Sequence, residues 1–138
     1  MLQRHAEAAG GGGITLAYIG GGSLNWAQVL MADLIHDAAI RGTVRLFDLD
    51  HAAAARNARL GNRLAQAHGR DLRFAVCPDL ASVLAGADFV VISILPGSFD
   101  DMEQDIGLPA GRGIAQSVGD TVGPGGFLRA MRAIQPGM

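Results

Sequence analysis

Three consecutive glycines at positions 20–22 separate a short apolar segment from the start of an amphipathic one. The segment before them, residues 14–19, is almost wholly apolar and rich in β-branched residues, which predicts a strand buried on both faces. Ser23 follows as a natural N-cap, so we predict a helix from there to about residue 40, with Trp26 and Leu34 on its apolar stripe. This order of strand, glycine loop and helix N-terminus is typical of loops whose free backbone N–H groups bind a diphosphate.

The alternation of strands and helices continues along the chain. We predict strands over residues 43–47, 72–76 and 88–94, the last buried on both faces, and helices over about 52–68 and just after Asp79. Strands that alternate with helices connect through right-handed crossovers, which gives a parallel sheet covered on both faces. The expected fold class is α/β, a Rossmann-like parallel sheet with helices on both faces, in truncated form.

The two ends of the chain differ from this pattern. Residues 1–13 finish in four glycines and are expected to form a flexible tail, so that residues 14–138 hold the Rossmann-type domain. Beyond residue 95 we expect an acidic stretch, a loop-like region with glycines at 107, 111 and 113, and a helix over 127–134. The glycines ahead of that helix indicate either a second close approach to a ligand or a simple helix start. Since the chain stops four residues later, we expect an incomplete domain.

Composition excludes several classes of partner. Eleven Lys and Arg against thirteen Asp and Glu give a net charge of −2, which offers no support for binding nucleic acid or an anionic membrane. The longest strongly apolar run, residues 89–95, is far below the roughly 18 residues that span a bilayer. The start of the chain lacks the apolar core of a secretory signal, and a single cysteine suits a reducing compartment. We therefore expect a cytoplasmic protein.

The candidate cofactor site lies at the carboxyl ends of the predicted strands. Gly20, Gly22 and Ser23 are expected to hold the diphosphate of NAD, although Asn25 stands where the usual fingerprint has a third glycine. Asp48 ends the second strand and is placed to accept hydrogen bonds from the adenosine ribose, which favours NAD over its phosphorylated form. The alternative is that the glycines merely turn the chain and Asp48 caps the next helix.

Two further residues extend this candidate site. Ser93 and Gly97 lie at the carboxyl end of the fourth predicted strand, where the nicotinamide and a substrate are expected to meet.

Several segments together resemble glycoside hydrolase family 4, whose members are NAD- and metal-dependent glycosidases. They are the glycine loop, the strand end at Asp48, residues 86–91, and above all the block QSVGDTVGPGGFLRAMR at 116–132. Residues 93–105 look closest to the α-galacturonidase and α-galactosidase branch. The resemblance covers residues 14–134 and corresponds to the N-terminal portion of such an enzyme.

The resemblance implies a redox-assisted elimination. NAD⁺ takes a hydride from C3 of the sugar, a tyrosine removes the C2 proton, the glycosidic oxygen leaves, water adds, and the hydride returns. A divalent metal, usually manganese, assists as a Lewis acid. Asp120 matches the acidic position that raises the basicity of the tyrosine, although on spacing alone it reads as a loop acid. The family's metal ligands and tyrosine find no match here, so we assign no metal-binding residue and expect this chain alone to be inactive.

The charge of the substrate also follows from the sequence. Residues 97–105 contain four carboxylates and no Arg or Lys, an environment that repels a phosphate, so we expect a non-phosphorylated sugar, an α-galacturonide or an α-galactoside or α-glucoside. The alternative is that these acids form a solvated helix face.

The full-length enzyme is expected to be a homo-oligomer. Other interpretations are a stand-alone NAD-binding module and a fragment of an NAD-dependent dehydrogenase.

Overall fold

The computed structural model describes residues 13–118 and 122–134. The chain divides into two compact units, Met1–Ile94 and Leu95–Met138, and each is described by itself. The predicted tail, apart from Gly13, and the candidate residue Asp120 lie outside the described residues.

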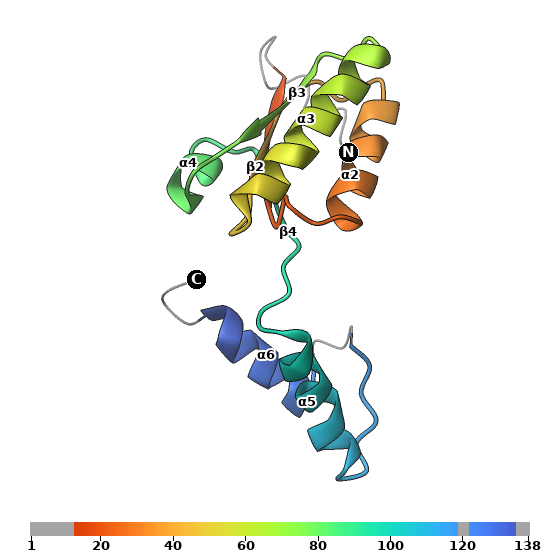
Figure 1. The fold of residues 1–138 in the computed structure, drawn as a ribbon, viewed down its shortest axis with the longest axis vertical. Helices are drawn as coiled ribbons and strands as arrows, with labels where there is room; N and C mark the ends of the chain where they lie inside the picture. Colours follow the sequence, from red (N-terminus) through yellow and green to blue (C-terminus); the bar gives the residue numbers. More distant parts are fainter. Residues whose placement is uncertain (1–12, 119–121, 135–138) are drawn as a thin grey trace. The chain divides into compact units, whose positions relative to one another are not determined.

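The first unit contains a four-stranded parallel sheet in the order β3-β2-β1-β4 (Figure 1). The strands are β1 (Ile14–Ile19), β2 (Gly42–Phe47), β3 (Leu72–Val76) and β4 (Phe89–Ile92). The predicted parallel sheet is therefore confirmed. The chain moves outward from β1 to β3 on one side and then crosses to β4 on the other, so the direction of winding reverses between β1 and β4. In open α/β sheets this reversal is where ligands bind, at the carboxyl ends of the strands.

Three helices cover the two faces of this sheet, as predicted. α2 (Trp26–His36) and α3 (His51–Ala67) lie on one face, and the short α4 (Leu80–Leu84) lies on the other (Figure 1). Asp79 caps α4 as predicted, accepting a hydrogen bond from the backbone N–H of Ser82 at 2.7 Å. The prediction of helices on both faces is confirmed.

Alternation along β1 distributes its side chains between the two cores. Leu16 and Tyr18 belong to the larger core under α2 and α3, and Tyr18 is 1% exposed. Ala17 points the other way and packs with Cys77 and Val83 under α4. This period of two is the geometry of a strand buried on both faces.

Helix α2 buries a different stripe from the predicted one and is shorter. Trp26 is 72% exposed, whereas Ala27, Met31 and Leu34 are buried. Ala27 has no exposed surface, and its small side chain lets the helix approach the sheet closely. The buried stripe therefore starts at Ala27, one residue after Trp26. The helix ends at His36, before the predicted position near residue 40.

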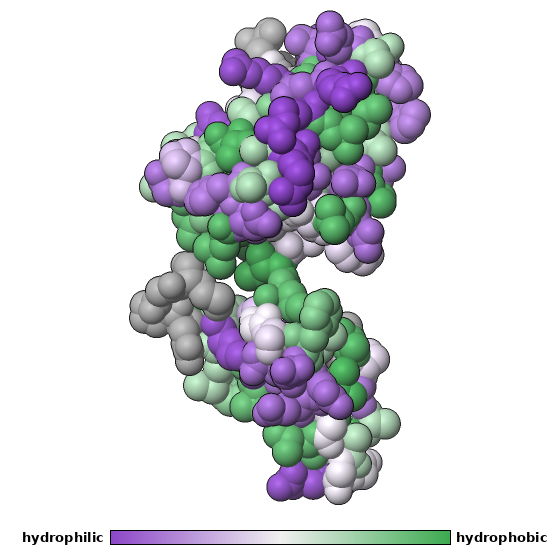
Figure 2. Space-filling model, in the orientation of Figure 1, coloured by the Kyte–Doolittle hydropathy of each residue, from purple (hydrophilic) through white to green (hydrophobic). Residues whose placement is uncertain are grey.

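Strand β4 is shorter and more exposed than predicted. Among the described residues it pairs with β1 alone, so it forms an edge of the sheet, and Phe89, Val90 and Ile92 are 41%, 49% and 65% exposed. Apolar surface continues where the chain leaves this strand (Figure 2). An exposed apolar edge can pair with another chain, even though β4 is only four residues long.

We expect this chain to self-associate through β4. Sedimentation velocity should show larger species that grow with protein concentration, and Ile92→Lys should reduce them because an edge lysine disfavours strand pairing. Leu49→Lys is the matched control, since Leu49 is 68% exposed and lies outside the strands. A monodisperse, cooperatively melting wild-type monomer contradicts the prediction.

The second unit is a pair of packed helices, α5 (Phe99–Ala110) and α6 (Pro124–Ile134). The predicted loop-like region is wrong in part, because Gly107 lies inside α5. Helix α6 begins three residues earlier than predicted, with Pro124 at its first position, where a missing N–H costs no hydrogen bond. Among the described residues, no helix combines the length and the apolar character that crossing a membrane requires.

Candidate dinucleotide site

The glycine loop after β1 lies directly against the end of β4. Gly20 has a φ of +93°, and a Cβ built on it would lie 1.9 Å from the backbone oxygen of Ser93. The N–H of Ser93 donates to the oxygen of Ile19 at 2.9 Å, which fixes this contact. Gly20 therefore needs both the left-handed backbone and the absence of a side chain.

The next two glycines approach β2 equally closely. A Cβ on Gly21 would lie 2.8 Å from the Leu46 Cβ, and one on Gly22 would lie 2.8 Å from the Asp48 Oδ2. The loop is thus a tight cradle between the carboxyl ends of β2 and β4, at the point where the winding of the sheet reverses. Simple chain reversal does not demand glycine at three successive positions, and these contacts show that the glycines also let the loop pack closely against β2 and β4.

The backbone N–H groups of residues 20–23 are all occupied, which differs from the expectation that they are free. Those of Gly20 and Gly21 both donate to the Phe47 oxygen at 2.9 Å, and that of Ser23 donates to the Gly20 oxygen at 3.2 Å. The N–H of Gly22 donates to the Asp48 carboxylate at 2.8 Å. The loop amides find these acceptors because β2 lies next to β1.

Open amides occur one step further along the chain. Within the described residues, the backbone N–H groups of Leu24 and Asn25 have no hydrogen-bond acceptor. The N-cap of α2 is Asn25, whose side chain makes no cap hydrogen bond, so the predicted N-cap at Ser23 is wrong by two residues. The Ser23 hydroxyl still accepts from the N–H of Trp26 at 3.2 Å. The open N–H groups of Leu24 and Asn25 therefore lie just before α2, at its positive end, where a phosphate can approach them.

Asp48 joins the loop to the following helix. Its Oδ2 accepts from Gly22, and its Oδ1 accepts from the N–H of Asp50 at 2.9 Å. The cap of α3 is Asp50, whose carboxylate accepts from Ala53 at 2.9 Å. The alternative in which Asp48 caps the next helix is therefore wrong.

A residue that the sequence analysis missed supports the loop from α3. Asn57 is 3% exposed, and its Nδ2 donates to the oxygens of Gly21 at 2.8 Å and Ser23 at 2.9 Å. A signal was present in the sequence, because Asn57 falls four residues after Ala53 and four before Gly61 on the buried stripe of the helix. An amide on such a stripe requires a polar partner.

The structure brings together most, but not all, of the predicted site residues. Gly20, Gly22, Ser23 and Asp48 meet in the loop, with Ser93 beside them. Gly97 lies in the other unit, has a φ of +97°, and packs against Asp101 and Arg132.

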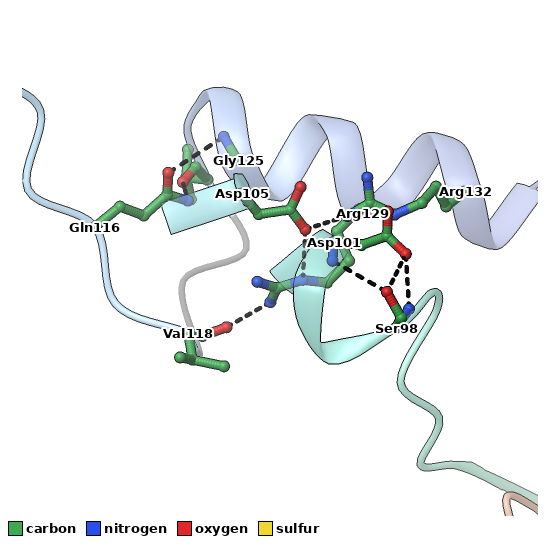
Figure 3. A network of polar contacts seen from close by, with 9 residues as sticks. Ser98, Asp101, Asp105, Gln116, Val118, Gly125, Arg129 and Arg132 are labelled. Atoms are coloured by element: carbon green, nitrogen blue, oxygen red, sulfur yellow. Dashed lines mark hydrogen bonds and ion pairs between the residues drawn. The ribbon is translucent and has the colours of Figure 1, made fainter. Parts of the chain in front are cut away.

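The predicted acidic stretch forms part of a polar network in the second unit (Figure 3). Asp105 is buried, lies 3.6 Å from the Arg129 Nε, and accepts a hydrogen bond from Arg132. The Asp105 hydrogen bond and charge raise the pKa of Arg132. Residues 97–105 themselves contain no Arg or Lys, but α6 places two arginines against α5.

Another of the four acids caps helix α5. The Asp101 carboxylate accepts from the Ser98 backbone N–H at 2.7 Å and hydroxyl at 2.8 Å, and the Ser98 hydroxyl accepts from the Asp101 N–H. These hydrogen bonds hold the pKa of Asp101 below its ordinary value. Only Asp100 and Glu103 remain as exposed surface charges, so the solvated-face alternative holds for half of the stretch.

Metal-binding residues are not gathered anywhere in the described part of the chain, where no three His, Cys, Asp or Glu residues form a group able to hold an ion. His36 and His68 contact each other at the ends of α2 and α3, with ring centroids 5.7 Å apart. His51 packs on Phe47 at the carboxyl end of β2, and Cys77 is a buried core residue.

Strand order, glycine cradle and helix placement define this chain as a Rossmann-like α/β protein. Among solved structures it is similar to the Bacillus subtilis protein lplD, with a TM-score of 0.73 and 52% identity over 88% of this chain and 27% of that one. It is also similar to the 6-phospho-β-glucosidase of Thermotoga maritima solved with NAD and glucose-6-phosphate, with a TM-score of 0.69 and 27% identity over 88% of this chain and 28% of that one.

Sequence comparison gives the family. The model described as family 4 glycosyl hydrolase matches residues 15–136, and the chain belongs to this family. It is 54% identical to the α-galacturonidases of Thermoanaerobacterium saccharolyticum and Bacillus subtilis, over 88% of this chain and 26% of each relative. The chain thus spans about a quarter of the length of these relatives.

Proposed function

We propose that this chain is the NAD-binding, N-terminal part of a glycosidase that hydrolyses the O-glycosidic bond of a non-phosphorylated sugar, an α-galacturonide in the first place. The observation that carries the proposal is the glycine cradle, in which three successive positions have no room for a side chain. The reversal of the sheet's winding at the same point supports it, because this is where α/β proteins bind nucleotides.

The open end of α2 is proposed to receive the diphosphate. The N–H groups of Leu24 and Asn25 are free to donate to phosphate oxygens, and the helix dipole favours the anion there.

Asp48 is proposed to bind the adenosine ribose. A carboxylate has about four lone-pair sites, and Asp48 uses two of them for Gly22 and Asp50, which leaves capacity for ribose hydroxyls. A phosphate on the 2′ position would meet this negative charge, so the site favours NAD over NADP.

Bound NAD supplies a reversible hydride acceptor for the sugar. The contribution of this chain is to hold the dinucleotide at the carboxyl edge of the sheet, with Ser93 proposed near the nicotinamide. The same role for Gly97 stays a prediction from the sequence. Asp120 remains, by family resemblance, the proposed acid that raises the basicity of the tyrosine base. The described residues do not fit a manganese ion, since they gather no ligand set, and we derive no step through one.

The substrate class rests on the relatives and on charge. Both relatives at 54% identity are α-galacturonidases. The second unit contains three arginines and five acids, which give a charge of 3 − 5 = −2. Arg129 and Arg132 are engaged by Asp105, which leaves the exposed Arg112 as the remaining arginine of this unit. The net negative charge disfavours a phosphate dianion here. We further propose that the enzyme acts in the cytoplasm, where Cys77 stays reduced, and as a homo-oligomer.

Calorimetric titration with NAD⁺ tests the function. Wild-type protein should bind NAD⁺ more tightly than NADP⁺, and Asp48→Asn should weaken NAD⁺ binding about tenfold or more through loss of a charged acceptor. Asp71→Asn is the matched control, because it removes the same charge from an exposed position just before β3. Unchanged affinity in Asp48→Asn removes that residue from the ribose role, and wild-type protein that fails to bind NAD⁺ at millimolar concentration refutes the proposed function.

A further inference from the structure

The buried side-chain amide of Asn57 forms hydrogen bonds with the glycine loop. Its Nδ2 makes two hydrogen bonds, to the backbone oxygens of Gly21 and Ser23, and both are shorter than 3.0 Å. Its Oδ1 accepts from the Gln28 Nε2 at 3.5 Å, so α2 contributes a contact to the same side chain. A side chain from the middle of α3 thus fixes two alternate carbonyl groups of the loop.

Fixing a carbonyl also fixes the next N–H. In a trans peptide the C=O of one residue and the N–H of the next point in opposite directions. The Gly21 oxygen shares its peptide plane with the Gly22 N–H, and the Ser23 oxygen shares its plane with the Leu24 N–H. By drawing both oxygens toward α3, Asn57 directs both N–H groups away from it. The first of them meets Asp48, and the second has no acceptor.

We infer that Asn57 is a positioning residue for the dinucleotide, one that orients the Leu24 N–H toward the diphosphate and the Gly22 N–H toward Asp48. This inference rests on the proposed function. One side chain thereby orients two N–H groups, one toward the diphosphate and one toward Asp48, the carboxylate proposed to bind the ribose. No substrate or cofactor atom touches Asn57, since it is 3% exposed.

The same helix provides a control for a purely structural role. Asn62 also uses its side-chain amide for two bonds to backbone, donating to the Phe74 oxygen at 2.7 Å and accepting from the Phe74 N–H at 2.9 Å. These bonds tie α3 to β3 and do not involve the glycine loop. Loss of either amide leaves backbone groups without partners and should lower stability.

The test compares Asn57→Leu with Asn62→Leu in the full chain. We expect both to lower the melting temperature. Asn57→Leu alone should raise the NAD⁺ dissociation constant about tenfold and speed amide hydrogen exchange at Gly22, whose N–H is bonded to Asp48. Should Asn57→Leu fail to fold, Asn57→Ser, which keeps one donor, should show a smaller loss of affinity with the same local increase in exchange.

Two results overturn the inference. One is wild-type NAD⁺ affinity in the Asn57 variant, and the other is unchanged exchange at Gly22. Amide hydrogen exchange also distinguishes the positioning role of Asn57 from the proposed function of the chain, because exchange is measured without cofactor. If wild-type protein does not bind NAD⁺, the proposed function fails and the role toward the dinucleotide fails with it. If the wild type binds and Asn57→Leu binds equally well, only the positioning role fails.

Discussion

Gly20→Ala is expected to destabilise the first unit by more than about 3 kcal/mol and to abolish measurable NAD⁺ binding. The alanine would carry a positive φ, which costs roughly 1–2 kcal/mol, and its Cβ would overlap the Ser93 oxygen at 1.9 Å. Either the loop or the end of β4 must move, so the cradle is lost together with its register to the strand. Thermal unfolding followed by circular dichroism and NAD⁺ titration measure the two effects.

Gly69→Ala is the control that measures the cost of a positive φ without a steric overlap. Gly69 also has a positive φ, +61°, but a Cβ there would meet no atom within 4 Å. This variant should lose only about 1 kcal/mol and keep its NAD⁺ affinity. Equal destabilisation by both substitutions would show that the contact with Ser93 contributes nothing.

Asp105→Asn is expected to destabilise the helix pair of the second unit by about 2–3 kcal/mol. The change keeps the shape of the side chain but removes the only carboxylate that the described structure pairs with Arg129 and Arg132. Both arginines are about three-quarters buried or more, so neither recovers full hydration in place. Hydrogen exchange of peptides from α5 and α6 measures the loss in this unit separately.

Glu103→Gln is the control, since it removes an equal charge from an exposed position on the same helix. It should change stability by less than about 0.5 kcal/mol. If it matches Asp105→Asn, net charge rather than the buried ion pair governs this unit. The Asp105 prediction would then be wrong.

The arrangement of elements was predictable because it depends on local patterns. Apolar runs of five or six residues, separated by amphipathic segments, predicted the parallel sheet, and Asp79 predicted the start of α4. The glycine cradle was found because Gly20 and Gly22 stand between a strand and a helix. Such signals depend on near neighbours in the chain, which a single sequence displays.

The features that were missed depend on contacts between distant residues. Exposure of β4 follows from its position at the edge of the sheet, which its composition does not reveal. The acceptors of the loop amides come from Phe47 and Asp48, more than twenty residues away, so their occupancy could not be read from the loop itself. The charge of the acidic stretch was overestimated because its arginine partners lie on α6.

Gly125, in the first turn of α6, has an explanation that involves no ligand. A Cβ on Gly125 would lie 2.1 Å from the backbone oxygen of Asp105, so the two helices touch main chain to main chain at this point. The glycine-rich motif that most strongly marks the family therefore contains at least one position selected by a neighbouring helix. The close contacts of Gly20, Gly21 and Gly22 are likewise with protein atoms, so in both loops the lack of a side chain lets the backbone pack against a neighbouring segment.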